Sequence, residues 1–194
     1  YQYYAGYVEG KDAGKIAFMA HALALDGQLK GGVTIGPNQR EAPPQLGQLL
    51  IGDESQKLAG NADFKTPAVT VLKTFDPLAG AFAYNTPLPQ TRADEVLISA
   101  DMLNRSGLGK VVIYSNDKIT VEAGSGLSLP AFGELALTGS QIDIRDNLSV
   151  TSGALAFTSQ LTQLNTPDRG VTVAPGVTLS VAGEWVNDVL TVPD

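Results

Sequence analysis

The stretch that decides the fold is Gly109-Lys110-Val111-Val112-Ile113, a glycine followed by a strand-like run with apolar residues at alternate positions. This glycine–strand motif occurs four more times, at residues 14–18, 47–51, 133–137 and 153–157. The last three copies start at residues 109, 133 and 153, so they are 24 and 20 residues apart. Repetition in the low twenties is typical of one coil of a β-solenoid. We therefore expect a scaffold whose function lies on its surface.

Residues 109–182 carry the most regular pattern. Apolar side chains two residues apart recur about every seven or eight residues, and each pair points to one face of its strand. Turn-forming residues separate the pairs, at 115–117, 122–126, 138–140 and 145–147. The pattern predicts an all-β parallel solenoid with three strands per coil, whose interior pairs are Val111/Ile113, Ile119/Val121, Leu127/Leu129, Leu135/Leu137, Ile142/Ile144, Leu148/Val150 and Leu155/Phe157.

The N-terminal half shows the same pattern with interruptions. Ile16/Phe18, Leu23/Leu25 and Leu29 predict a first coil. Residues 31–46 and 52–108 read as insertions, because proline is excluded from central ladder positions. Within the second insertion we expect a strand at 69–72 and a short helix at 99–105, with Ser99 as N-cap and Gly107 at its end. Insertions in repeat proteins often form the binding face.

Composition narrows the function classes. The 194 residues carry a net charge of −7, which argues against nucleic acid or an anionic membrane as partner. There is no cysteine, which excludes disulfides, thiolate metal sites and a thiol nucleophile. No apolar run approaches the roughly 20 residues of a membrane span. Tyr1-Gln2-Tyr3-Tyr4 does not look like a signal peptide. We expect residues 1–194 to be a single segment of a larger protein.

Several stretches resemble the filamentous haemagglutinin family of large secreted bacterial proteins. They are residues 7–14 with Leu25-Asp26-Gly27, residues 103–109, and residues 173–183 with Trp185-Val186-Asn187-Asp188. The resemblance covers most of the chain and is weakest from 53 to 92. The stretch 171–188 is its most specific part.

The resemblance implies a right-handed parallel β-helix and a non-enzymatic adhesin on the surface of a Gram-negative bacterium. It also implies export by an outer-membrane two-partner secretion transporter. The secretion signal of the family is not matched here, so we expect this segment to lie further along its protein. The expected role is a rigid stalk, with the two insertions as a surface for a host or matrix glycan or protein.

Carboxylates allow an alternative function. Polysaccharide lyases and hydrolases also use parallel β-helices, and hydrolysis needs two acids roughly 5–10 Å apart. Glu122 or Asp117 could face Asp143 or Asp146 on the next coil, with Arg145 to stabilise developing charge. Exposed acids on such a fold are more often only solvated, so we predict no catalytic residue. A filament or biofilm-matrix subunit that polymerises through its ends is a third hypothesis.

Other chemistry is sparse in this sequence. His21 is the one histidine and is expected to be solvated or hydrogen-bonded rather than a zinc ligand. Acidic and amide side chains at 116–117 and 143–147 could attract calcium, but turns explain them without a ligand. We therefore predict no metal and no cofactor.

Tyrosines are the predicted binding residues, since exposed tyrosine favours recognition. They are Tyr3, Tyr4 and Tyr7 near the start, which could instead pack on a preceding coil, and Tyr84 in the second insertion. Trp185 is expected to pack against the core or the end of the stack.

Overall fold

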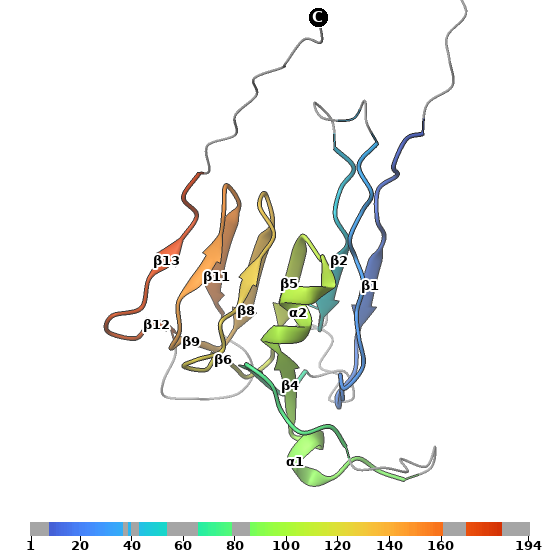
Figure 1. The fold of residues 1–194 in the computed structure, drawn as a ribbon. Coiled ribbons are helices and arrows are strands. Elements are labelled where there is room, and N and C mark those ends of the chain that lie inside the picture. The colour runs from blue at the N-terminus through green and yellow to red at the C-terminus, as the bar shows by residue number, and fades with distance from the viewer. Residues whose placement is uncertain are drawn as a thin grey trace, which may run out of the picture.

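The computed structural model describes residues 8–36, 39, 43–53, 66–78, 86–160 and 170–183. Within them the chain forms thirteen short strands and two short helices. The strands make three sheets of five, five and three strands, and every strand pair is parallel (Figure 1).

Sheet A contains one strand from each glycine–strand motif, in chain order. The predicted strands at these five places are confirmed, and all five lie side by side. Their alternating side chains explain why: one face of each strand is apolar and is removed from water by its neighbours. The strands are β1 (Lys15–Phe18), β2 (Gln48–Ile51), β5 (Lys110–Tyr114), β8 (Glu134–Gly139) and β11 (Ala154–Ser159).

Sheets B and C hold the remaining strands. Sheet B runs in the order β4 (Glu95–Ser99), β3 (Ala68–Leu72), β6 (Lys118–Val121), β9 (Gln141–Ile144) and β12 (Gly170–Val173). Sheet C runs in the order β7 (Ser128–Leu129), β10 (Leu148–Val150) and β13 (Leu179–Ser180). The predicted strand at 69–72 is confirmed as β3.

The core is built from rows of apolar side chains that stack from strand to strand. In sheet A, Leu49 lies beside Val111 and Val111 beside Leu135, and all three are at most 1% exposed. In sheet B, Ile119 lies beside Ile142 and both are fully buried. The first six predicted interior pairs are therefore confirmed as buried. Leu155 and Phe157, on the edge strand β11, are only partly buried and pack against that core.

Close backbone packing requires glycine at some positions of the motif, and Gly133 shows this most directly. Gly109 donates a backbone hydrogen bond to the carbonyl of Gly47 at 2.9 Å, and the Gly109 carbonyl accepts one from Glu134 at 2.7 Å. A Cβ on Gly133 would lie 2.7 Å from the Gly109 carbonyl oxygen and 2.8 Å from that of Pro130. No larger residue fits at position 133 without a backbone shift, so glycine opens this copy of the motif for steric reasons.

The predicted right-handed parallel β-helix with three strands per coil is wrong for this chain. The structure has three parallel sheets, and they do not close into a solenoid. Sheet C has three strands of two or three residues, and none of them precedes Ser128. The predicted strand at Leu23/Leu25 is not formed, since residues 19–30 contain no strand. The first predicted coil is therefore incomplete.

The strands of sheet B do not all follow one another in chain order, as they would in a regular solenoid. β4 lies outside β3, whereas β6, which comes later, pairs with the other side of β3. The chain therefore turns back after β3 before it advances again. The region predicted as an insertion at 52–108 thus supplies two strands of sheet B rather than a surface loop alone.

Helix α2 (Ala100–Ser106) follows β4 directly and confirms the predicted short helix. The Ser99 hydroxyl accepts a hydrogen bond from the Met102 amide at 3.2 Å, and Gly107 ends the helix at φ 70°. Leu103 lies fully buried in the core. The helix was predictable because its cap and its terminating glycine are local signals.

A buried arginine anchors the segment between β3 and β4, where helix α1 (Gln90–Ala93) lies. The Arg92 guanidinium forms an ion pair with Asp26 and stacks over the Phe75 ring, 4.7 Å from its centroid. It therefore joins the segment that follows β1 to the segment that precedes β4. No helix in the described parts of the chain is long and apolar enough to cross a membrane.

Candidate binding groove

A groove lies at the amino ends of the sheet A strands. All these strands are parallel, so the segments that lead into β2, β5 and β8 lie side by side at the amino ends of the strands. The groove has a volume of about 540 Å³, within the roughly 300–1,000 Å³ of small-ligand sites. We call it the Phe132 groove, and the side chains that matter below are Val33, Ile35, Pro43, Pro44, Gln48, Lys110, Phe132 and Glu134.

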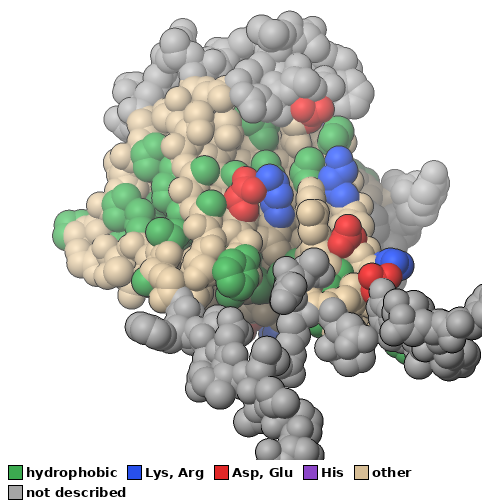
Figure 2. Space-filling view, turned by 90° about the horizontal axis from the view of Figure 1, so that it is seen from above, with side chains coloured by type: hydrophobic (Ala, Val, Ile, Leu, Met, Phe, Trp, Pro, Cys, Tyr) green, Lys and Arg blue, Asp and Glu red, His purple; other side chains and the backbone are tan. Residues whose placement is uncertain are grey.

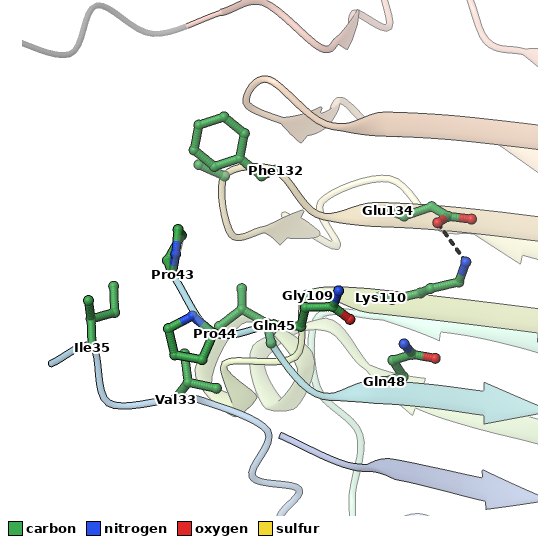
Figure 3. Close-up of a pocket in the computed structure, with 12 residues that line it drawn as sticks. Val33, Ile35, Pro43, Pro44, Gln45, Gln48, Gly109, Lys110, Phe132 and Glu134 are labelled. Carbon is green, nitrogen blue, oxygen red and sulfur yellow. Dashed lines mark hydrogen bonds and ion pairs between the residues drawn. The ribbon is translucent and has the colours of Figure 1, made fainter. Parts of the chain in front are cut away.

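One wall of the Phe132 groove is apolar. Val33 and Ile35 come from the chain between β1 and β2, and Pro43 and Pro44 come from the segment that leads into β2. Figure 3 shows these four side chains on one side and the Phe132 ring across from them. Prolines fix the backbone of that wall, so it loses little conformational entropy when a ligand binds.

The inner end of the groove is polar. Gln48 pairs in register with Lys110, and Lys110 with Glu134, so the three side chains form a row across sheet A. Lys110 Nζ lies 2.7 Å from Glu134 Oε2, an ion pair that Figure 3 marks with a dashed line. Both side chains are more than one third exposed. Their remaining donor and acceptor positions can meet hydroxyl, amide or carboxylate groups of a ligand.

Phe132 holds an unfavourable backbone conformation. Its φ is 61°, in the left-handed region that bulky residues rarely adopt, and its side chain is 77% exposed. Two backbone hydrogen bonds flank this position: Phe132 N–H donates to the Thr151 carbonyl at 2.8 Å, and Gly133 N–H donates to the Pro130 carbonyl at 3.1 Å. Backbone strain of this kind concentrates at functional sites. An aromatic ring held in water at the rim of a groove is suited to stacking on a ligand.

The carboxylates considered for catalysis form a structural network on the outer face of sheet B. Asp143 points away from the core, as predicted, and Lys118 Nζ lies 2.7 Å from its carboxylate. Arg145 joins Asp143 to Glu122, at 3.4 and 2.9 Å. The structure thus brings together Glu122, Asp143 and Arg145. The Asp143 side chain is nevertheless only 10% exposed.

Hydrogen bonding controls the charge of Asp143. Burial alone would raise the pKa of this carboxyl, but hydrogen bonds from Lys118, Thr172 and Gln141 outweigh burial and lower the pKa to about 2. Thr172 donates at 2.6 Å and Gln141 at 3.0 Å. A group that is ionised at all ordinary pH values has no proton to give to a glycosidic oxygen.

Asp146 was considered as one of two catalytic acids, but its contacts in the structure are those of a residue that stabilises turns. Its carboxylate accepts hydrogen bonds from the Gly126 amide at 2.7 Å and the Ser125 hydroxyl at 3.1 Å. The backbone hydrogen bond from Gly126 is the main reason that the pKa of Asp146 lies below its usual value. Asp146 therefore ties the turn after β6 to the turn after β9.

The predicted tyrosines are not placed by this structure. Tyr3, Tyr4, Tyr7 and Tyr84 lie outside the described residues, as does Trp185. His21 follows β1 and is exposed. In the parts of the chain that are described, no three metal-ligating side chains come together.

The sequence did not identify the lining residues of the groove as a binding site. Of the segments that line it, only the region 31–46 was predicted as a binding surface, and this region supplies the apolar wall. A local signal existed for Phe132: it stands between Ala131 and Gly133 in a turn, where glycine or asparagine is usual. The Lys110–Glu134 pair could be found only with the register of β5 and β8, because 24 residues separate the two side chains.

Comparisons with family models, curated proteins and solved structures found no match to this chain. The geometry above is therefore the basis for a functional proposal.

Proposed function

We propose that this chain is a non-enzymatic recognition module, a segment of a secreted or surface-exposed bacterial adhesin. In this account the parallel sheets are a rigid scaffold and the Phe132 groove is the binding site. The partner is a host or matrix glycan or protein. Export through a two-partner secretion transporter remains part of the proposal and depends on the family resemblance of residues 171–188.

The observation that carries the proposal is Phe132. A large aromatic side chain stands 77% exposed on a left-handed backbone, opposite an apolar wall and beside a polar row. Neither folding nor solubility favours phenylalanine at such a position. A ligand that covers the ring would supply the missing contact.

The composition of the groove fits a ligand with both apolar and polar faces. A pyranose ring can stack its C–H face on Phe132 while its hydroxyls reach Gln48, Lys110 and Glu134. An extended peptide can lay an apolar side chain between Phe132 and Pro44 and use the same polar row. Both belong to the ligand classes of the proposal.

The test is a screen of the purified chain on glycan and matrix-protein arrays, with two matched variants. Phe132→Ala removes the ring from the groove. Met19→Ala is the control, because Met19 is also an exposed apolar side chain but follows the carboxyl end of β1. We expect at least one ligand that binds wild type and Met19→Ala equally, and Phe132→Ala at least tenfold more weakly.

Two results would count against the proposal. One is the absence of any array ligand for the wild-type chain. The other is a ligand that Phe132→Ala binds as tightly as wild type, since the binding site would then lie elsewhere on the molecule.

A further inference from the structure

The segment between β3 and β4 contains a chemically labile peptide bond, Asp76–Pro77. It is the one Asp-Pro dipeptide in the sequence, and both residues are exposed to water. The bond is a tertiary amide, because the proline nitrogen carries no hydrogen. Such a nitrogen is protonated more easily than that of an ordinary peptide bond, and the aspartate carboxyl can attack its own carbonyl carbon by closing a succinic anhydride ring. The bond is therefore prone to cleavage by its own side chain.

Both sides of this bond are held by the buried ion pair between Arg92 and Asp26. Arg92 Nη1 donates a hydrogen bond to the Asp76 carbonyl oxygen at 3.4 Å. On the other side of the proline, the Leu78 amide donates to Asp26 Oδ2 at 2.8 Å. Arg92 Nη2 and Asp26 Oδ1 form the ion pair itself. We call the four residues Asp26, Asp76, Leu78 and Arg92 the Asp76 clamp; it lies beside α1, below β4 in Figure 1.

Arg92 is placed to stabilise negative charge on the Asp76 carbonyl oxygen. The charged side chains in view in Figure 2 lie at the surface, as is usual, whereas the Arg92 side chain is only 7% exposed. A hydrogen bond from a buried guanidinium is stronger than one in water, because its surroundings have a low dielectric constant. Arg92 Nε has no hydrogen-bond partner among the described residues, and few buried donors are left in that state. The guanidinium therefore has more donor capacity than the fold uses.

The attacking group is available. Within the described parts of the chain, the Asp76 carboxylate takes part in no hydrogen bond or ion pair. The Asp26 carboxylate, by contrast, is held by both Arg92 and the Leu78 amide. The clamp thus fixes the carbonyl and leaves the carboxylate of the same residue free to turn toward it. Intramolecular attack on a fixed carbonyl gains from proximity and orientation.

We propose that the folded chain cleaves its own Asp76–Pro77 bond. A carboxyl oxygen of Asp76 forms a bond to the Asp76 carbonyl carbon, and the carbonyl oxygen takes up the electron pair beside Arg92 Nη1, as in an oxyanion hole. The carboxyl proton passes to the Pro77 nitrogen, and the C–N bond breaks. One water molecule then opens the cyclic anhydride at Asp76, so the two product chains have ordinary ends and only water is consumed.

The fold holds the two product chains together. β3 belongs to the fragment 1–76 and pairs with β4 and β6, which both belong to the fragment 77–194. In sheet A, β2 of the first fragment pairs with β5 of the second. Cleavage therefore gives a two-chain form of the same fold. It happens once per molecule, so it is compatible with a non-enzymatic recognition module and does not depend on what the Phe132 groove binds.

The first test follows the purified full chain by mass spectrometry during incubation in neutral and in mildly acidic buffer. We expect two fragments whose masses add up to that of the chain plus one water, with a new N-terminus at Pro77-Leu78. The fragments should separate on a denaturing gel and elute together in size-exclusion chromatography without denaturant. The same chain unfolded in urea lacks the clamp and should be cleaved at least tenfold more slowly.

Variants separate the attacking group from the clamp. Asp76→Ala removes the carboxyl and should abolish cleavage, whereas Asp94→Ala removes another exposed acid near α1 and should leave the rate unchanged. Arg92→Gln removes the charge beside the carbonyl and should slow cleavage at least tenfold in a chain whose circular dichroism is that of wild type. If that variant does not fold, Arg92→Lys keeps the charge without the planar fork that joins Asp26 to the carbonyl, and it should slow cleavage too.

Three results would overturn the proposal. One is a wild-type chain that stays intact in both buffers. Another is cleavage at the same rate in the folded and the urea-unfolded chain, which would mean that the bond is only intrinsically labile. The third is a folded Arg92 variant that is cleaved as fast as wild type.

Discussion

At the scale of single residues, the glycines of the motif differ in the space around them. The structure therefore indicates which of them can be replaced by alanine. A Cβ on Gly133 would meet two backbone carbonyl oxygens, whereas a Cβ on Gly14 would meet nothing within 4 Å. We expect Gly133→Ala to lower the free energy of unfolding by about 1–3 kcal/mol through overpacking. Gly14→Ala should be neutral or slightly stabilising. Urea unfolding measures both, and equal effects would contradict the steric explanation.

Phe132 is expected to combine a cost in stability with a gain in binding. Asparagine tolerates the left-handed region, so Phe132→Asn should raise the free energy of unfolding by about 1 kcal/mol. In a domain of this size that raises the Tm by roughly 2–4 °C. Little burial is lost, because Phe132 is 77% exposed. The same variant should lose ligand binding, a trade-off that functional sites often show.

Thermal unfolding measures this prediction, with Met19→Asn as a control for the loss of an exposed apolar side chain. A Phe132→Asn variant that melts at or below the wild-type temperature, relative to that control, would mean that the backbone at residue 132 is not strained.

At the scale of the strands, Asp143 joins three members of sheet B. Its carboxylate contacts Lys118 at the start of β6 and Thr172 on β12, while Asp143 itself belongs to β9. Its folded-state pKa of about 2 is lower than the value near 4 expected in the unfolded chain. The ionised carboxylate therefore stabilises the fold above about pH 4, and this contribution is lost as the pH falls toward 2.

The corresponding variant is Asp143→Asn. At pH 7 it should be destabilised by about 1–3 kcal/mol, because it loses hydrogen bonds to charged partners. Its stability should also change less than that of wild type between pH 4 and pH 2, as measured by urea unfolding at each pH. The same pH dependence in both proteins would show that other carboxylates control acid unfolding.

Local patterns predicted the five strands of sheet A and one helix correctly, but they also predicted a strand at Leu23/Leu25 that is not formed, and they missed β4. Alternating apolar residues located the five strands of sheet A, and a serine with a later glycine located α2. The reversal of β3 and β4 was missed because nothing local reports which side of β3 receives the next strand. Arg92 was missed for the same reason: its partner Asp26 is 66 residues away in sequence.

At the scale of the whole molecule, the spacing of the repeated motif predicted less of the fold than the local patterns did. The motif spacing of 24 and 20 residues correctly indicated parallel stacking in the second half of the chain. It did not predict the missing strands of sheet C, because residues 19–30 and α2 take the place of regular coils. The apolar wall of the Phe132 groove comes from other irregular stretches, residues 33–35 and 43–44 between β1 and β2.

The measurement that tests the account most directly is amide hydrogen exchange, with and without the tightest ligand from the arrays. Binding in the Phe132 groove predicts slower exchange at 43–48 and 131–134, and unchanged exchange at 15–18 and 118–121. The strands would exchange slowly in both states, as expected of a rigid scaffold. Protection located away from the groove, or no protection at a saturating concentration of ligand, would contradict the assignment of this groove as the binding site.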